Sequence, residues 1–406
     1  MAEQHEKTLV PQIRFAGFTD PWEQRKLGDV ARRVTRKNEN RDSDLPLTIS
    51  AQYGLVDQRT FFNNQVASKD MSGYFLLHKG EFAYNKSTST DSPWGAIKRL
   101  EKYDMGCVST LYICFELLSG DPDFLVTYYE TDRWYKAVQL IAAEGARNHG
   151  LLNIAPDDFF ETQICIPKRI DEQRRIGAFF DRLDSLITLH QRKYDKLCVL
   201  KKSMLDKMFP KGGSLYPEIR FAGFTDPWEQ RKLGELFEEH SEKDRDDLPA
   251  LTIIQGGGTV HRDESNRNLQ FDRNSLSNYK VVDTGDFIVH LRSFEGGLEK
   301  ATCCGLVSPA YHIFRGKNVD SDFYYLYFRS KRFIDADLKP HVYGIRDGRS
   351  IDIEGMKTIF IPWTNLAEQR RIGAFFDHLD SLITLHQRKL ELLRNIKKSM
   401  LDKMFV

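Results

Sequence analysis

The sequence predicts an α+β protein in which two mixed α/β domains are separated by two long helices, packed as an antiparallel coiled coil with pseudo-two-fold symmetry. Two internal repeats carry this prediction. Residues 219–234 repeat residues 13–28, IRFAGFTDPWEQRKLG, without a change. Residues 368–405 match residues 172–209 at 31 of 38 positions. The two segments that lie between the repeats show no such identity.

The alternation of constant and variable segments bears on function. Packing alone tolerates many sequences. The near-identity of the two helices includes their surface residues and therefore predicts that both helices contact the same kind of partner. The variable segments, residues 29–171 and 235–367, predict two different targets. We therefore expect a chain that reads two targets from one shared frame.

Composition excludes several classes of protein. A chain of 406 residues is expected to hold more than one domain, and 41% hydrophobic residues with 29% charged residues are typical of a soluble protein with real cores. No run approaches the ~18 apolar residues of a membrane span, and residues 1–15 contain no apolar signal region. None of the six cysteines forms a C-x-x-C pair, which argues against a zinc site or a disulfide framework. The expected location is cytoplasmic.

The net charge of +1 conceals a local bias. The long repeats carry +4 in residues 172–209 and +3 in residues 368–406, so the rest of the chain sums to −6. A strongly basic domain would indicate nucleic-acid binding directly. In this chain such binding would depend on local clusters or on a partner that supplies more positive charge.

The first domain is expected to contain several strands. The short repeats hold Trp22 and Trp228, which we interpret as core anchors rather than base-stacking residues. Residues 74–77, 108–115 and 160–166 have the β-branched and aromatic composition of strands.

The first long repeat reads as a helix. Two rows of apolar residues recur at seven-residue steps, the pattern of a coiled-coil seam: Ile176, Leu183, Leu197 and Met204, and Phe179, Leu186 and Leu200. Pro210 and the glycines that follow end this helix, which would be ~57 Å long at 1.5 Å per residue.

The second domain is expected to repeat the first with a different surface. Residues 251–254, 286–289, 307–314 and 358–361 have strand composition. Short echoes link the domains: GEF at residue 80 with GDF at residue 285, VSTLY at 108 with VSPAY at 307, and GAR at 145 with GIR at 344.

The second long repeat requires a partner for its apolar seam, and the first repeat is the obvious one. Connectivity favours antiparallel packing, because a parallel pair would force a linker of about ten residues to span much of a helix. The predicted segments are a first domain at residues 1–171, a helix at 172–210, a second domain at 211–367 and a helix at 368–406.

The motifs of this chain resemble the specificity subunit of a Type I restriction–modification enzyme. The resemblance rests on EQRRIGAFFDRLDSLI and EQRRIGAFFDHLDSLI, each following an Ile-Pro strand end, and on GEFAYNKS at residues 80–87 with VSTLY at 108–112. It covers essentially the whole chain. The second domain departs from the pattern, with GDFIVHLRS in place of GEFAYNKS.

This resemblance implies a function and a set of partners. The two variable segments would be target-recognition domains that read an asymmetric, bipartite sequence in double-stranded DNA. The helices would set the spacing and dock two modification (methyltransferase) subunits, which bind S-adenosylmethionine and methylate adenine. Restriction (translocase and endonuclease) subunits would bring chemistry that needs ATP and Mg²⁺. No cofactor and no metal is expected in this chain itself.

Motifs for catalysis are absent from the sequence. It has no G-x-x-x-x-G-K-[ST], no H-E-x-x-H and no Pro-Pro pair of the kind found in adenine methyltransferases. We therefore expect a non-catalytic chain. The alternatives are a diverged DNA nuclease or methyltransferase with its own active site, and a coiled-coil assembly protein, which would not need two divergent domains.

Polar clusters near strand ends are the candidate DNA contacts, because hydrogen-bond donors and cations are the groups that read base edges and phosphates. In the first domain they are Asn85, Lys86, Ser87, Thr88, Arg147, Asn148 and His149, and in the second His290, Arg292, Ser293, Tyr343, Arg346 and Arg349. The competing interpretation is that these are ordinary solvated loops. The pairs Lys201-Lys202 and Lys397-Lys398 favour a solvated helix face or a partner contact over phosphate binding.

Overall fold

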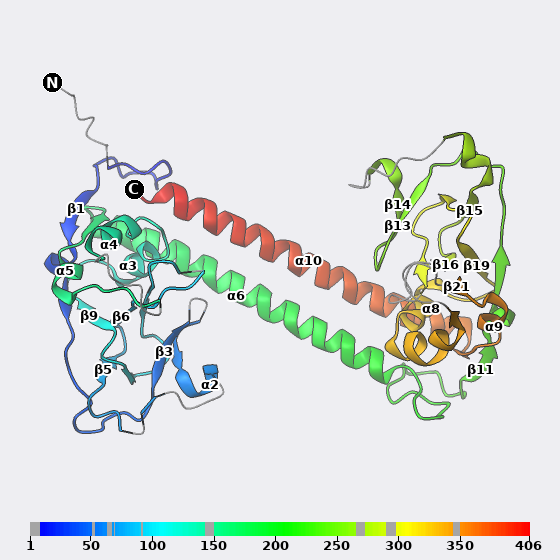
Figure 1. The fold of residues 1–406 in the computed structure, drawn as a ribbon, viewed down its shortest axis with the longest axis horizontal. Coiled ribbons are helices and arrows are strands. Elements are labelled where there is room, and N and C mark those ends of the chain that lie inside the picture. Colours follow the sequence, from blue (N-terminus) through cyan, green and yellow to red (C-terminus); the bar gives the residue numbers. More distant parts are fainter. Residues whose placement is uncertain are drawn as a thin grey trace. The chain divides into compact units, whose positions relative to one another are not determined.

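The computed structural model describes residues 9–50, 53–62, 67–68, 70–90, 92–142, 150–264, 273–289, 298–343 and 350–406. Two sheet-containing domains and two long helices are evident (Figure 1). The chain divides into two compact units, of which unit 1 holds residues 1–191 and 388–406 and unit 2 holds residues 192–387. Each unit therefore combines one variable domain with a part of both long helices.

Unit 1 is built around a four-stranded sheet in the order β2-β9-β6-β7, with all neighbours antiparallel. Its strands are β2 (Ala31–Arg33), β9 (Ile113–Leu117), β6 (Phe82–Asn85) and β7 (Ala96–Arg99). Three antiparallel pairs accompany it: β1 (Glu23–Lys26) with β10 (Gln163–Ile166), β3 (Leu47–Ser50) with β4 (Gly54–Asp57), and β5 (Phe75–His78) with β8 (Met105–Val108). The short helices are α1 (Leu27–Val30), α2 (Gln58–Phe62), α3 (Pro122–Tyr128), α4 (Tyr135–Ile141) and α5 (Pro156–Phe160).

Unit 2 has the same plan, with a four-stranded sheet in the order β12-β19-β16-β17. Its strands are β12 (Phe237–His240), β19 (His312–Gly316), β16 (Phe287–Val289) and β17 (Glu299–Lys300). The antiparallel pairs are β11 (Glu229–Lys232) with β22 (Phe360–Trp363), β13 (Leu251–Ile254) with β14 (Gly258–His261), β15 (Lys280–Val282) with β18 (Gly305–Val307), and β20 (Val342–Tyr343) with β21 (Ser350–Ile351). The helical segments are α7 (Leu233–Leu236), η1 (Arg262–Glu264), η2 (Arg273–Asn278), α8 (Ser321–Phe328), η4 (Phe333–Leu338), η5 (Lys339–His341) and α9 (Ile353–Lys357).

The core of unit 1 lies between its sheet, α3 and the start of the first long helix. Phe82 and Phe115 stack across neighbouring strands with ring centroids 5.1 Å apart. Phe124 of α3 and Ile176 of the long helix join the same buried cluster. Trp22 is 2% exposed within it, so the prediction of a core anchor is confirmed for this residue.

The core of unit 2 repeats this arrangement. Phe287 and Phe314 occupy the sheet, Phe323 comes from α8 and Ile372 from the second long helix. Trp228 is 1% exposed and is likewise a core anchor. The expectation that the two domains share one fold is confirmed.

The long helices are α6 (Ile170–Lys207) and α10 (Leu366–Met404). Within unit 1 they run antiparallel, because Asp184 of α6 pairs with Lys397 of α10 at 2.6 Å while Gln191, further along α6, pairs with Arg394, earlier in α10, at 3.0 Å. The predicted fold class, two mixed α/β domains with two long antiparallel helices, is therefore confirmed.

The predicted seam describes only part of what the long helices bury. Ile176 and Leu183 are buried, but Leu186 and Leu200 are 39% and 38% exposed. Phe180, outside both predicted rows, is 1% exposed because it packs into the domain core. The first turns of α6 thus belong to the core of a domain as well as to a helix pair.

Two strand predictions were wrong in the same way. Residues 108–115 form the end of β8 and the start of β9, and residues 307–314 form the end of β18 and the start of β19. The interruption is a turn in each unit, since Tyr112 N donates to Ser109 O at 3.1 Å and Tyr311 N donates to Ser308 O at 3.1 Å. Serine and the Pro309 that follows in unit 2 are common turn residues, and the apolar composition on both sides concealed them.

Candidate nucleic-acid interface

A buried ion pair fixes the start of each long helix to its own domain. In unit 1 the Arg14 guanidinium donates to both carboxylate oxygens of Glu172, at 2.6 and 2.8 Å, and Glu172 is 1% exposed. Trp22 Nε1 also donates to Glu172, at 3.4 Å. In unit 2 Arg220 donates to Glu368 at the same two distances. A buried carboxylate needs such partners, because an unpaired buried charge is costly.

A glutamine next to that carboxylate joins the helix to the rest of the domain. In unit 1 Gln173 Oε1 accepts from the backbone N of Asp121 at 2.8 Å, and its Nε2 donates to Pro167 O at 2.8 Å. In unit 2 Gln369 accepts from the backbone N of Asp320 at 2.9 Å. Asp121 and Asp320 are the N-cap residues of α3 and α8. The glutamines therefore hold the first turn of these short helices against the long ones.

The glycine of the EQRRIG motif permits a close approach between helices. A Cβ at Gly177 would lie 2.7 Å from Asp123 Cβ and 2.8 Å from Phe124 N, and one at Gly373 would lie 2.6 Å from Asp320 Oδ1. Contacts inside each unit thus account for the identity of Glu, Gln and Gly in the two repeats, without an outside partner.

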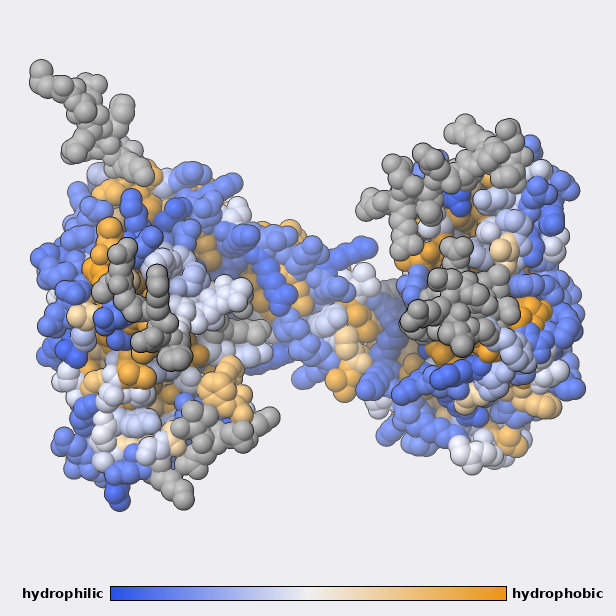
Figure 2. Space-filling view, viewed as in Figure 1, coloured by the Kyte–Doolittle hydropathy of each residue, from blue (hydrophilic) through white to orange (hydrophobic). Residues whose placement is uncertain are grey.

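Exposed positions on the long helices repeat as well, and internal packing does not account for them. Residues 183–193 and 379–389 have the identical sequence LDSLITLHQRK. Leu189 is 47% exposed and its counterpart Leu385 is 45% exposed. Figure 2 shows apolar patches along the helices on the face in view. Each long helix therefore carries, in an identical stretch, exposed leucines together with charged and polar residues.

The first predicted cluster lies at the end of β6. Asn85 Oδ1 accepts from the backbone N of Ser87 at 3.0 Å, and Ser87 bridges to Leu151. Thr88 donates from both its backbone N and its Oγ1 to Gly150 O, at 2.6 and 3.0 Å. This polar run is therefore an ordered segment that is hydrogen-bonded to residues 150–152.

Lys86 is held through both its side chain and its backbone. Its Nζ donates to Ile154 O at 3.2 Å, and its backbone O accepts from Leu152 N at 3.0 Å. Burial lowers the pKa of the Lys86 ammonium. A lysine held in this way has less freedom to reach a phosphate than the sequence alone implies.

Most of the other predicted contacts lie outside the described residues. These are Arg147, Asn148, His149, His290, Arg292, Ser293, Arg346 and Arg349. Tyr343 is described: it is 56% exposed on β20, opposite Ser350 of β21. The structure thus brings Asn85, Lys86, Ser87 and Thr88 together, and it presents Tyr343 at the surface of unit 2.

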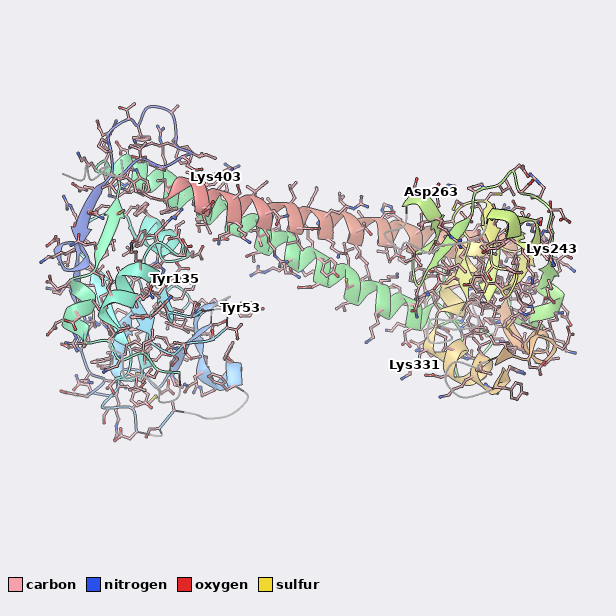
Figure 3. All side chains as sticks on the ribbon, turned by 45° about the horizontal axis from the view of Figure 1, so that its top comes forward. Tyr53, Tyr135, Lys243, Asp263, Lys331 and Lys403 are labelled. Atoms are coloured by element: carbon pink, nitrogen blue, oxygen red, sulfur yellow. The ribbon has the colours of Figure 1, made fainter. Side chains whose placement is uncertain are left out.

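The sequence did not single out an exposed aromatic group in unit 1. Tyr53 is 56% exposed beside the turn between β3 and β4 (Figure 3), and Lys102 Nζ lies 5.7 Å from its ring centroid. Phe61 and Phe62 of α2 are 46% and 47% exposed. The signal that could have found the turn is Gly54, which adopts φ +72°, a conformation that favours glycine.

The described residues contain no group of three or more His, Cys, Asp or Glu side chains arranged to hold a metal ion. None of the helices in the described ranges has the length and apolar character needed to cross a membrane.

Comparisons with known proteins identify what this chain resembles. No family model matches it. A curated relative, the "Type I restriction enzyme MjaVIII specificity subunit" of Methanocaldococcus jannaschii, is 22% identical over 316 residues, which cover 73% of this chain and 73% of that protein.

A solved structure gives a matching result at the level of the fold. The S subunit of a Type I restriction–modification system from M. genitalium has a TM-score of 0.52 at 15% identity and covers 98% of this chain and 99% of its own. The HsdS subunit from Thermoanaerobacter tengcongensis has a TM-score of 0.43 at 18% identity, with coverage of 95% and 96%. The resemblance to Type I specificity subunits is confirmed.

Proposed function

We propose that this chain is the sequence-specific DNA-binding specificity subunit of a Type I restriction–modification complex. In this proposal it reads an asymmetric, bipartite target in double-stranded DNA. It thereby directs adenine methylation or restriction by partner subunits and has no catalytic activity of its own.

One observation carries the proposal furthest: two domains of one fold bear different surfaces on the same helical frame. The sheet orders β2-β9-β6-β7 and β12-β19-β16-β17 correspond strand for strand. By contrast, the turn between β3 and β4 contains Tyr53 next to a glycine, whereas the turn between β13 and β14 contains Gly256 and Gly257 and leads into Gly258, the first residue of β14. Two different surfaces on one scaffold suit two different half-sites, and this is a reason to expect a non-palindromic target.

The residues proposed to contact DNA are those that the sequence indicated. Asn85, Lys86, Ser87 and Thr88 offer amide, ammonium and hydroxyl groups at the end of β6, and Tyr343 offers an exposed phenol on β20. Such groups read base edges or bind phosphates. Arg147, Asn148, His149, His290, Arg292, Ser293, Arg346 and Arg349 complete the proposed set.

The proposed protein partners are two modification subunits and the restriction subunits. Support for two copies of one partner comes from the identical sequence of residues 183–193 and 379–389, in which Leu189 and Leu385 are exposed to nearly the same degree. A helix face with exposed leucines beside charged residues suits docking of another protein. S-adenosylmethionine, ATP and Mg²⁺ are proposed to act on these partners.

The first experiment is sequencing-based detection of methylated adenine in cells that express this chain together with its modification subunit. We expect a bipartite, asymmetric motif that disappears when the gene for this chain is removed. Methylation of an unchanged motif without the chain would contradict the proposal.

A second experiment separates the specificity role from an enzyme. The purified chain alone is incubated with DNA in the presence of S-adenosylmethionine, and separately with ATP and Mg²⁺. We expect no methyl transfer and no cleavage. Turnover by the chain alone would favour a diverged nuclease or methyltransferase. Replacing residues 29–171 by the corresponding domain of a relative should change one half-site and leave the other unchanged.

A further inference from the structure

Four charged side chains of unit 1 form one cluster where the first domain meets the long helices. Lys397 of α10 lies 2.6 Å from Asp184 of α6 and 2.7 Å from Glu130, which follows α3. Lys98 of β7 lies 3.5 Å from Glu130. We call these four residues the Lys397 cluster. It links a recognition domain to both helices through a single ammonium group.

Three members of the Lys397 cluster are largely shielded from water, and the four charges sum to zero. The side chains of Lys397, Glu130 and Lys98 are 19%, 21% and 19% exposed, whereas that of Asp184 is 44% exposed. Burial works to raise the pKa of the Glu130 carboxyl, but the ammonium groups of Lys397 and Lys98 outweigh it and hold that pKa below its usual range. Two carboxylates thus face two ammonium groups, and salt screens such a pair less than one on the open surface.

Unit 2 carries the same pair of positions with the charges exchanged. Glu299 pairs with Ile288 in the sheet of unit 2, and Lys98 pairs with Ala83 in the sheet of unit 1. Lys98 and Glu299 therefore occupy equivalent positions. Arg329 follows the α8 N-cap Asp320 by nine residues, as Glu130 follows the α3 N-cap Asp121.

The exchanged pair of unit 2 is itself satisfied. Arg329 donates to Glu299, whose side chain is 5% exposed. The pair inside the domain is kept in both units, and only its polarity is reversed.

The helix lysine is the same in both units, but its partners are not. Lys201, the counterpart of Lys397 in the repeat, lies 2.5 Å from Asp380. Lys397 also pairs with Glu130. The residue of unit 2 that is equivalent to Glu130 is Arg329, and an arginine cannot form an ion pair with a lysine. Two nearly identical helices therefore hold the two domains with different ion pairs.

We propose that Glu130 is a positioning residue that fixes the orientation of the first recognition domain on the two helices through Lys397, and that the second domain is held without this ion pair. The consequence of this inference rests on the proposed function: the way in which the first domain is positioned on its DNA half-site depends on Glu130. In this proposal the two long helices can keep nearly one sequence. Whether a domain forms an ion pair with the helix lysine depends on the domain's own residue, Glu130 in unit 1 or Arg329 in unit 2.

The chain itself supplies the test variant. The double substitution Lys98→Glu with Glu130→Arg reproduces the pair found in unit 2, so the interior ion pair is kept while Lys397 is left with Asp184 alone. Glu130→Gln removes the charge without a large change in shape. The matched control is Glu116→Gln, which removes the carboxylate of an exposed pair with Arg32 on the same sheet.

The first measurement does not involve DNA. Hydrogen exchange of the full chain with its modification subunits should show faster exchange at residues 122–141 and 390–404 in both test variants, with β6 and β9 unchanged. No change at these segments, in variants that are folded, would overturn the inference whatever the chain binds.

The second measurement is binding to DNA targets whose spacer is lengthened or shortened by one base pair. The wild-type complex should bind these targets more weakly than the normal one. In both test variants this ratio of affinities should be smaller by about fivefold, which is the size of coupling expected between residues in contact. Discrimination against a changed base in the second half-site should stay as in wild type. If the variants are less stable but discriminate between spacer lengths as the wild type does, Glu130 contributes to stability and does not position the domain. A wild-type complex with no sequence preference would count against the proposed function, and hydrogen exchange would still decide the role of Glu130.

Discussion

At the scale of single residues, the repeats are explained by buried polar contacts that an apolar pattern does not reveal. Glu172 and Glu368 each lie almost fully buried under an arginine of the short repeat. Neither partner of such a pair can be replaced alone without leaving the other charge unpaired away from water. The short and the long repeats are therefore constrained together, although they lie 158 residues apart in unit 1.

The Arg14–Glu172 pair gives a prediction for stability. Arg14→Ala leaves the Glu172 carboxylate buried without its guanidinium and should lower the free energy of unfolding of unit 1 by about 3–5 kcal/mol. Urea unfolding followed by tryptophan fluorescence measures this change. The control Arg41→Ala removes an exposed pair with Asp70, 3.9 Å apart, and should cost less than about 1 kcal/mol. Equal effects of the two variants would contradict the assignment.

The cysteines give a prediction for pH. Burial raises the pKa of the Cys107 thiol to about 11 and that of Cys114 to about 12, and both side chains are buried. In the native chain at pH 8 neither should react with iodoacetamide, whereas the exposed Cys304 should. Mass spectrometry after timed alkylation identifies the modified residues.

The same shift has a consequence for stability. Because the folded state holds these two protons to a higher pH than the unfolded state, this contribution to stability is full below pH 9, the ordinary pKa, and falls as the pH rises above it. Urea midpoints at pH 8 and pH 10 should be closer together in the Cys114→Ala variant than in the wild-type chain. Rapid alkylation of Cys114 in the folded chain at pH 8 would show that it is not buried.

At the scale of elements, each long helix has two environments along its length. Its first turns pack into a domain core through Ile176 and Phe180 in α6, or Ile372 and Phe376 in α10. Further along, exposed leucines such as Leu189 alternate with charged residues. A single helix therefore serves as part of a domain, as half of a helix pair and as a surface for other proteins.

The close approach at Gly177 gives a prediction for the helix. Gly to Ala in an exposed helix interior normally stabilises by about 1 kcal/mol. Gly177→Ala should destabilise instead, because its Cβ would meet Asp123 Cβ at 2.7 Å and Phe124 N at 2.8 Å. The control Ser185→Ala, at an exposed position of the same helix, should be neutral or slightly stabilising. Thermal unfolding of both variants decides the sign, and a stabilised Gly177→Ala chain would show that α3 does not press on α6.

At the scale of the whole molecule, unit 1 is completed by a segment from far away in the sequence, whereas unit 2 is one continuous stretch, residues 192–387. Residues 388–406 belong to unit 1 with the first domain. Phe405 packs against Trp22 with ring centroids 5.9 Å apart and stacks on Phe124 at 5.5 Å. The first domain therefore has a complete core only after the last residues of the chain have been added.

Truncation of that last aromatic residue should act on one unit only. Phe405→Ala should lower the stability of unit 1 by about 3–5 kcal/mol, the usual cost of removing a buried phenylalanine. Hydrogen exchange should speed up at β6 and β9 while β16 and β19 stay as in wild type. The counterpart Phe209→Ala, which removes a ring from Trp228 and Phe323, should do the reverse. Faster exchange in both units for either variant would mean that they unfold as one body.

The sequence by itself determined the repeats, the two long helices, the mixed α/β domains and the core role of Trp22 and Trp228. These features follow from local periodicity, composition and repetition, which are written along the chain. The sequence also placed Asn85, Ser87 and Thr88 in one polar segment, because consecutive residues after a strand stay together.

Only the tertiary structure decided the partners of the charged and polar groups. It broke residues 108–115 into two strands, tied Lys86 to the carbonyl of Ile154, and placed Glu130 on Lys397 where unit 2 has Arg329. The physical reason is that burial and ion pairing depend on residues up to a few hundred positions away in the chain. The type of amino acid determines which bonds a side chain can make, and only the fold determines which of these bonds it does make.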